Sequence, residues 1–157
     1  LFNRTKFYAD PVDEDFGKTE VPCTLYEFSL DIDTGIQEKF AASGELYFCK
    51  ADVVMPEITA TLKFEHSSFA VNQKKLWREN TPQLIRLVTT GSKLATAGLK
   101  YSNKMAIIDL PGMWSKINKI SEDNGNDLMD GEFRVAYDPT AGKFATITVV
   151  NELATLP

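Results

Sequence analysis

The chain has 157 residues, of which 43% are hydrophobic and 25% are charged. This length and composition are typical of one folded domain and exclude an intrinsically disordered chain. The formal net charge of −5 argues against tight wrapping around nucleic acid, because such binding needs lysines and arginines to displace counterions from phosphates. No apolar run approaches the roughly 20 residues needed to cross a bilayer. We therefore expect a single domain over residues 1–157 with no membrane partner.

The N-terminal part of the sequence predicts three strands. Lys6–Ala9 is a short aromatic strand, and the acidic, proline-containing segment Asp10–Asp15 that follows it is typical of a solvated turn. In Thr24–Asp33 and in Pro56–Glu65, apolar and polar residues alternate with a period of two. In the first of these two strands the expected core face is Tyr26, Phe28, Leu30 and Ile32. Both segments are therefore predicted to be half-buried strands.

A long excursion, Thr34–Met55, separates these two strands and carries a weaker β signal in Glu45–Cys49. Compact domains seldom contain twenty or so residues of this kind without a functional reason. Exposed segments that can form strands are pairing surfaces for other chains. The excursion therefore favours a protein that assembles with itself over a monomer.

One helix is predicted after the third strand. Ser67 and Ser68 can cap a helix over Phe69–Glu79, and Thr81–Pro82 ends it. Phe69, Leu76 and Trp77 recur at helical spacing, which indicates one apolar face laid on a sheet.

Four more β-rich runs complete the chain: Gln83–Thr89, Met105–Leu110, Leu128–Asp138 and Lys143–Val150. We expect Met129, Gly131, Phe133, Val135 and Tyr137 to share one face, and the last two runs to form a hairpin through Asp138–Lys143. About seven strands and one helix predict a mainly β fold: an antiparallel β-sandwich or barrel-like sheet with one flanking α-helix.

The sequence predicts no catalytic, cofactor-binding or metal-binding residues. His66 is the only histidine, and we expect it to be structural or solvent-exposed. Cys23 and Cys49 lack the close spacing of zinc ligands. The favoured interpretation is two reduced cysteines packed as small hydrophobic residues, with a disulfide as the alternative.

Pairs of acidic residues give only weak support for a catalytic or calcium-binding site. Asp31 with Asp33, or Asp123 with Asp127, could serve a glycosidase or bind calcium. However, Ser121–Asp127 lacks the glutamate of an EF-hand and is predicted to be a turn-forming loop. No phosphate-binding loop or nucleophile motif is present, so we expect a protein that is not an enzyme and has no cofactor.

Four segments, in their order and spacing, resemble the tail tube proteins of long-tailed phages. They are Leu25–Ile32 leading into Gly35, Pro56–Leu62, Ala106–Pro111, and Phe133–Asp138 followed by Val149–Asn151. The resemblance covers nearly the whole chain and is strongest to the C-terminal domain of two-domain tube proteins. Because the chain starts at Leu1 with a strand almost at once, we expect that it is one half of a larger protein.

The resemblance implies a β-sandwich whose subunits form hexameric rings or pseudo-hexameric trimers. The inner sheets of a ring would merge into one barrel, and stacked rings would form a channel through which DNA passes without specific binding. Thr34–Met55 would be the long loop that reaches the adjacent ring. The strands near Tyr26–Ile32 and Pro56–Glu65 would line the lumen, where an acidic surface repels DNA and lets it slide.

The resemblance also implies a place in the virion tail, assembly in the bacterial host cytoplasm and contacts with other tail proteins. Tail terminators and baseplate hub domains share the fold, so the position along the tail stays open. The alternative function is a carbohydrate- or receptor-binding β-sandwich of a tail tip or decoration protein. Such a module needs exposed aromatic platforms, for which Trp77, Trp114 and Tyr101 are candidates. Trp77 is expected to pack in the core, whereas Trp114 is expected in a loop.

A hydrolase is the third hypothesis. It would require two carboxylates facing each other across a concave pocket.

Overall fold

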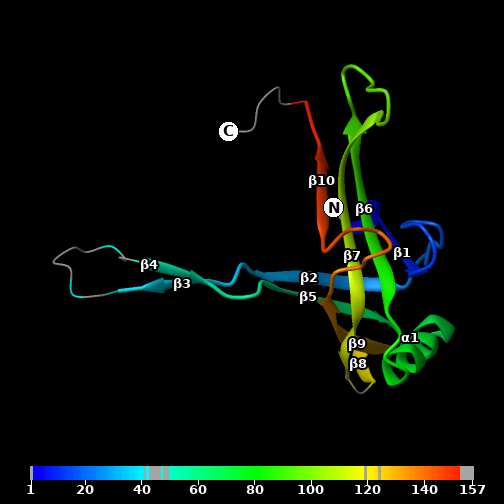
Figure 1. Cartoon of the computed structure of the whole chain (residues 1–157). Coiled ribbons are helices and arrows are strands. Elements are labelled where there is room, and N and C mark those ends of the chain that lie inside the picture. The colour runs from blue at the N-terminus through cyan, green and yellow to red at the C-terminus, as the bar shows by residue number, and fades with distance from the viewer. Residues whose placement is uncertain are drawn as a thin grey trace.

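The computed structural model describes residues 2–40, 42, 47, 50–118, 120–123 and 125–152 (Figure 1). Within these residues, ten strands, one α-helix and one short 3-10 helix follow each other along the chain. The elements are η1 (Phe2–Arg4), β1 (Thr5–Pro11), β2 (Leu25–Asp33), β3 (Ile36–Lys39), β4 (Lys50–Val53), β5 (Glu57–Glu65), α1 (Ser68–Arg78), β6 (Gln83–Lys93), β7 (Asn103–Ile117), β8 (Ser121–Asp123), β9 (Asn126–Val135) and β10 (Thr146–Val150).

Eight of the strands form one antiparallel sheet with the order β1-β6-β7-β9-β5-β2, to which β10 is added beside β7 and β8 beside β9. The sheet folds over itself, so that β6, β7 and β10 run steeply across β2 and β5 (Figure 1). One layer contains β1, β6, β10 and the first part of β7. The other contains the last part of β7 together with β9, β5 and β2. The predicted mainly β, antiparallel fold with one helix is confirmed.

The two layers are joined by β7, which changes partner at Pro111 and Gly112. Met105–Asp109 pairs with β10, whereas Gly112–Ile117 pairs with β9. A Cβ atom at Gly112 would lie 2.2 Å from the carbonyl oxygen of Arg134, so a larger residue cannot occupy this corner without a backbone shift. Proline, which lacks a backbone N–H, is tolerated where the ladder changes partner. Because Pro111–Gly112 is typical of a turn, the sequence prediction ended the strand too early.

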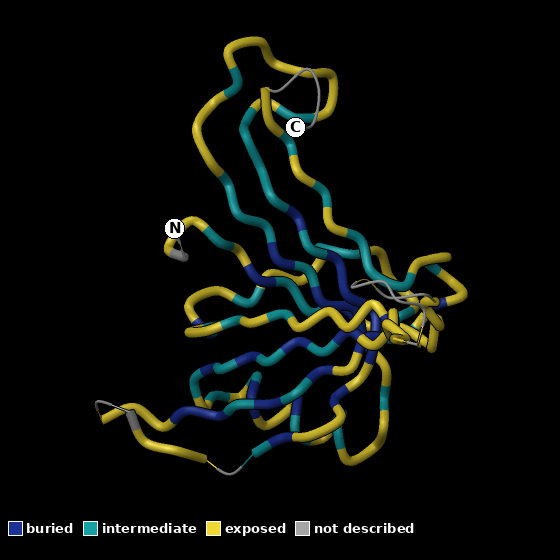
Figure 2. The backbone as a smooth tube through the Cα atoms, turned by 90° about the vertical axis from the view of Figure 1, so that its left-hand side faces the viewer, coloured by how far each residue is buried: buried dark blue, intermediate teal, exposed yellow. Residues whose placement is uncertain are grey.

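The core lies between the layers and is centred on aromatic residues (Figure 2). Trp114 packs against Phe64 and Phe133, with ring centroids 5.8 and 5.3 Å apart. Phe69 of α1 contacts Phe7 and Phe64 edge-on, so the helix closes one side of the sandwich. Trp114 is 2% exposed, and the prediction that it lies in a loop is wrong.

The helix begins close to the predicted position, with Ser67 as its N-cap. Ser67 makes no side-chain cap bond, however, and its Oγ is buried without a hydrogen-bond partner among the described residues. After Arg78 the chain turns at Asn80, which has a φ of +50° and donates its N–H to the carbonyl of Trp77. Asparagine tolerates this left-handed conformation better than most residues, so the helix stops before Thr81–Pro82.

The predicted hairpin between the last two strands is wrong. A bridge between Asp138 and Lys143 does close the expected turn, but β10 then pairs with β7, with Thr146 opposite Asp109. The physical reason is that β9 is already flanked by β5 and β7 and has no free edge to offer. Tyr137, expected on the core face of this strand, lies beyond its end and is exposed.

Two further details of the sequence prediction are corrected. In β2, a bulge between Leu25 and Glu27 shifts the alternation. Leu25 rather than Tyr26 therefore packs on the core together with Phe28 and Leu30. Ile32 stays on the same face as Phe28 and Leu30, opposite Ile58, but is exposed near the end of the strand. In addition, Ser121–Asp127 is not a plain loop, because Ser121–Asp123 pairs with Asn126–Leu128 as a tight hairpin.

The carboxamide of Gln73 ties the helix to the core, since its Oε1 accepts hydrogen bonds from Trp114 Nε1 (2.8 Å) and Gln83 Nε2 (2.6 Å). Gln73→Ala leaves both buried donors unpaired. We expect the free energy of unfolding to fall by about 2–4 kcal/mol, because each unpaired buried group costs about 1–3 kcal/mol. Urea denaturation measures this, with the exposed helix residue Lys75→Ala as the control. An equal loss in both variants would contradict the role of Gln73.

Candidate assembly surface

The outward face of the second layer, here called the acidic face, is formed by cross-strand rows of polar residues. Glu27 of β2 lies opposite Lys63 of β5, which lies opposite Asp130 of β9. The next rows are Ser29, Thr61, Glu132 and Lys116, and then Asp31, Thr59, Arg134 and Met113. Asp33 and Glu57 form the last pair. Directly opposed residues share one face of a sheet, so all these side chains point away from the core.

This face concentrates negative charge, and no other element of the described part of the chain covers it. It carries six carboxylates (Glu27, Asp31, Asp33, Glu57, Asp130 and Glu132) and three cations (Lys63, Lys116 and Arg134). Two of the cations are engaged in exposed ion pairs, Lys116 with Glu132 and Arg134 with Glu57. The face is therefore hydrophilic and negatively charged, as the resemblance led us to expect for a lumen.

The excursion predicted from the sequence is a β-arm made of β3 and β4, which extends away from the end of β2 and β5 (Figure 1). Every residue of both strands is exposed. A two-stranded hairpin alone is marginally stable in water, so an arm of this kind gains stability by contact with another surface. Most of the Glu45–Cys49 β signal falls outside the described residues.

An apolar groove of about 590 Å³ lies at the base of the β-arm. It is lined by Met55, Pro56, Met113, Val135, Tyr137 and Phe144, with Glu57 and Arg134 at its rim. Met55 is 89% exposed and Tyr137 is 63% exposed, so no other part of the described chain fills the groove. Exposed contiguous apolar surface of this kind marks an interaction site.

Apart from the three-residue strand β8, which pairs only with β9, two strands of the main sheet have a free edge within the described part of the chain. β2 ends the strand order, and β10 pairs only with β7. By contrast, Thr19–Val21 covers part of the edge of β1, through hydrogen bonds from Ala9 N to Thr19 O and from Val21 N to Phe7 O. Uncovered edges offer backbone donors and acceptors to another chain.

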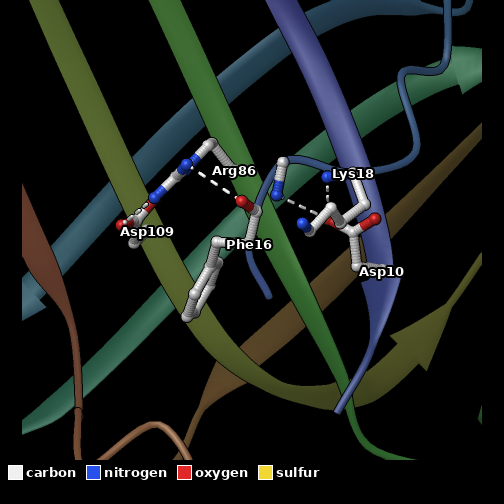
Figure 3. Close-up of polar contacts among 6 residues, drawn as sticks. Asp10, Phe16, Lys18, Arg86 and Asp109 are labelled. Atoms are coloured by element: carbon white, nitrogen blue, oxygen red, sulfur yellow. Dashed lines mark hydrogen bonds and ion pairs between the residues drawn. The ribbon is translucent and has the colours of Figure 1, made fainter. Parts of the chain in front are cut away.

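On the outward face of the first layer, an ionic network fixes the loop after β1 (Figure 3). Arg86 on β6 pairs with Asp109 on β7 through two bonds of 2.6 and 2.8 Å, and its Nη1 donates to the carbonyl of Phe16. The carboxylate of Asp10 accepts the backbone N–H groups of Gly17, Lys18 and Thr19. Asp10 is 1% exposed, so the prediction that Asp10–Asp15 is wholly a solvated turn is wrong at this residue.

Carboxylates set the pKa shifts in and near this layer. The hydrogen bonds to Asp109 raise the pKa of Arg86, although partial burial opposes the shift. Glu152 bonds Lys104 and the N–H of Ala95, which lowers the pKa of Glu152 and ties the end of β10 to the β6–β7 hairpin. Both shifts favour the charged forms, which hold these segments in place at neutral pH.

The histidine and cysteine residues considered as catalytic or metal-binding groups do not form a common site among the described residues. His66 is exposed, as predicted, and its backbone N–H donates to the carbonyl of Asp127. Cys23 is a free, exposed thiol, so the interpretation of a packed cysteine is wrong for it, and Cys49 lies outside the described residues. Among the described residues, no group of three or more His, Cys, Asp or Glu side chains is placed to hold a metal ion.

None of the three aromatic residues considered as carbohydrate platforms, Trp77, Tyr101 and Trp114, is exposed. Trp114 is in the core, and Trp77 packs against it as predicted, with its Nε1 donating to the carbonyl of Ser115. Tyr101 is half-buried beside Lys100, whose Nζ lies 5.3 Å from the ring centroid. In the described part of the chain, no helix is both long and apolar enough to cross a membrane.

An acidic sheet face, an exposed β-arm, an apolar groove and free strand edges are the surface features of this β-sandwich that suit contact with other chains. No protein-family model matches the chain, and no curated protein matches its sequence. Among solved structures, the chain is similar to the SPP1 tail tube, determined by solid-state NMR and cryo EM. The TM-score is 0.59 at 5% identity, over 85% of this chain and 74% of that chain. The chain therefore has the fold of a phage tail tube protein, and the predicted resemblance is confirmed at the level of fold.

The Arg86–Asp109 pair allows a quantitative test of the first layer. Removing one partner leaves the other charge buried, so we expect Asp109→Ala to lower the free energy of unfolding by about 2–3 kcal/mol. Replacing both partners by apolar residues (R86M with D109L) should recover much of this loss. Chemical denaturation of R86M, D109L and the R86M, D109L double variant gives the coupling energy. Additive losses would contradict a coupled buried pair.

Proposed function

We propose that this chain is a structural subunit of a phage tail tube and that it assembles into stacked rings around a channel for DNA. The observation that carries the proposal is the acidic face, an uncovered sheet surface of four strands with little apolar area. A sheet face that is neither packed nor apolar suits the wall of a water-filled channel. The fold shared with the SPP1 tail tube supports the same function.

The charge of this face supports its assignment to the lumen. Six carboxylates against three cations repel the phosphate backbone of DNA, which can then slide without binding. This assignment places β2 and β5, the strands suggested by the resemblance, in the lumen together with β9 and the end of β7. The ionic network around Arg86 then lies on the outer wall.

The β-arm and the free edges supply the contacts between subunits in this proposal. The edges of neighbouring sheets pair within a ring, and the arm reaches the adjacent ring. The ring is either a hexamer of this domain or a trimer of a longer chain in which this domain is the C-terminal half. The subunit assembles in the bacterial host cytoplasm, joins other tail proteins and resides in the virion tail, and it has a structural rather than an enzymatic role.

Electron microscopy of the concentrated, purified protein tests assembly directly, with its mass in solution measured in parallel. We expect rings or tubes with a central channel, because the free edges and the arm can be satisfied only by other copies. Replacing residues 39–50 by a short Gly-Ser turn, which keeps the base of the arm, should leave the domain folded but prevent ring stacking. A persistent monomer at high concentration would overturn the proposal.

Reversing charge on the acidic face tests the lumen. Tubes of the Glu27→Lys, Asp31→Lys variant should retain DNA about tenfold more than wild-type tubes at low salt, and added salt should remove the effect. The matched control reverses two acidic residues of the outer loop, Asp13→Lys with Glu14→Lys. Equal retention by both variants in filter binding would show that β2 does not line the channel.

A further inference from the structure

The exposed apolar residues of this chain are concentrated at one end of the molecule. Eight of the fifteen exposed large hydrophobic side chains in the described part of the chain lie on the β-arm or in the groove at its base. They are Ile36, Phe40, Tyr47, Val53, Val54, Met55, Met113 and Tyr137. This concentration indicates that the β-arm and the groove at its base are interaction surfaces.

The β-arm has two chemically different faces. Ile36 lies opposite Val53, and Glu38 lies opposite Ala51, so these four residues share one face, here called the apolar arm face. The opposite face carries Gln37, Lys39, Lys50 and Asp52, where Lys39 and Asp52 form an ion pair. Every residue of both faces is exposed, yet only the apolar arm face gains from being covered.

The groove and the apolar arm face are similar in chemistry, and they lie at the same level along the length of the β-arm. Its floor is apolar, and Arg134 at its rim complements Glu38, the single charged residue among the four of the apolar arm face. Val53 is only two residues from Met55, which lines the groove, so both surfaces lie at the same level along the arm. The arm of the same chain leaves the groove open, since Met55 and Tyr137 are largely exposed.

Rotational symmetry then indicates whether the groove that receives the arm base belongs to a copy in the same ring or to a copy in the next ring. If the arms of a ring point along its axis, rotation about that axis keeps equal parts of all copies at equal height. The base of one arm therefore lies at the level of the groove of its lateral neighbour, whereas a copy in the next ring is displaced by the thickness of a ring. Only the tip of the arm extends far enough to contact the adjacent ring.

We propose that the apolar arm face at the arm base, centred on Ile36 and Val53, packs into the Met55–Met113–Tyr137 groove of the adjacent copy in the same ring. The contact is heterologous, because it joins two different surfaces of identical chains, and contacts of this kind generate a ring when the rotation closes. It adds a buried apolar contact between subunits to the pairing of strand edges. The inference rests on the proposed assembly into rings.

A cysteine pair placed on separate chains tests the contact. In a Cys23→Ser, Cys49→Ser background, chains with Val53→Cys are mixed with chains with Tyr137→Cys under conditions of assembly and are then oxidised. We expect a disulfide-linked dimer on a denaturing gel. The matched control, Gln37→Cys mixed with Tyr137→Cys, places the thiol on the opposite arm face and should give at least about tenfold less dimer, because a disulfide needs Cα atoms within about 7 Å.

Both cysteines on one chain separate the two possible neighbours. Lateral contacts should produce a ladder of linked species that ends at the number of subunits in one ring. A ladder that continues beyond this number would place the contact between rings and overturn the lateral assignment. If wild-type protein forms tubes but the Val53→Cys, Tyr137→Cys variant gives no crosslink, the inference alone is overturned. A wild-type protein that never assembles would overturn both the inference and the proposed function.

Introducing a charge on the apolar arm face tests the contact independently, through the fraction of protein that forms rings. Val53→Asp should lower the fraction of protein in rings at least about tenfold, because a carboxylate would be buried in an apolar groove. Gln37→Asp should assemble normally. The melting temperature of the monomer should stay unchanged in both, since both side chains are exposed. Equal assembly of the two variants would contradict the proposed contact.

Discussion

The change of partner along β7 is the constraint on which the rest of the structure depends. One strand serves both layers because Pro111–Gly112 lets its backbone approach Arg134 closely and move from β10 to β9. This corner places Trp114 between the layers, where Phe64 and Phe133 surround it and Gln73 binds its indole N–H. The helix, the core and the separation of an inner from an outer sheet face all follow from that position.

The corner also separates the chemistry of the two outward faces. The first layer stabilises its outward charges with local partners: Asp109 holds Arg86, and three backbone N–H groups hold Asp10. The second layer leaves its carboxylates in excess over its cations on an open face. A charge that is neutralised locally contributes to folding, whereas an uncompensated charge on a solvated face acts on whatever passes nearby. This difference makes the second layer, rather than the first, the candidate channel wall.

Elements marked by a local alternation of apolar and polar residues were predicted from the sequence. Features that depend on contacts with residues distant in the sequence were missed. Alternation located β5 and most of β2, and a serine pair located the start of α1. The strand through Pro111–Gly112 was missed because this dipeptide is normally a turn signal, and the position of β10 depends on β9 having no free edge. The acidic face could be anticipated from Glu27, Asp31 and Asp33. The groove could not, since Met113 was assigned to a loop and Tyr137 to the core.

The two free edges differ in a way that bears on how copies can meet. β2 carries Glu27, Asp31 and Asp33, so pairing two copies of β2 would bring like charges together and is disfavoured. β10, with the sequence Thr146-Ile147-Thr148-Val149-Val150, is uncharged and has no such protection. Charge on one edge therefore disfavours the symmetric β2–β2 dimer, whereas a contact between β2 and β10 brings no like charges together. Contacts between unlike surfaces generate rings when the rotation closes, so the charge pattern of a single strand already favours a ring over a symmetric dimer through β2.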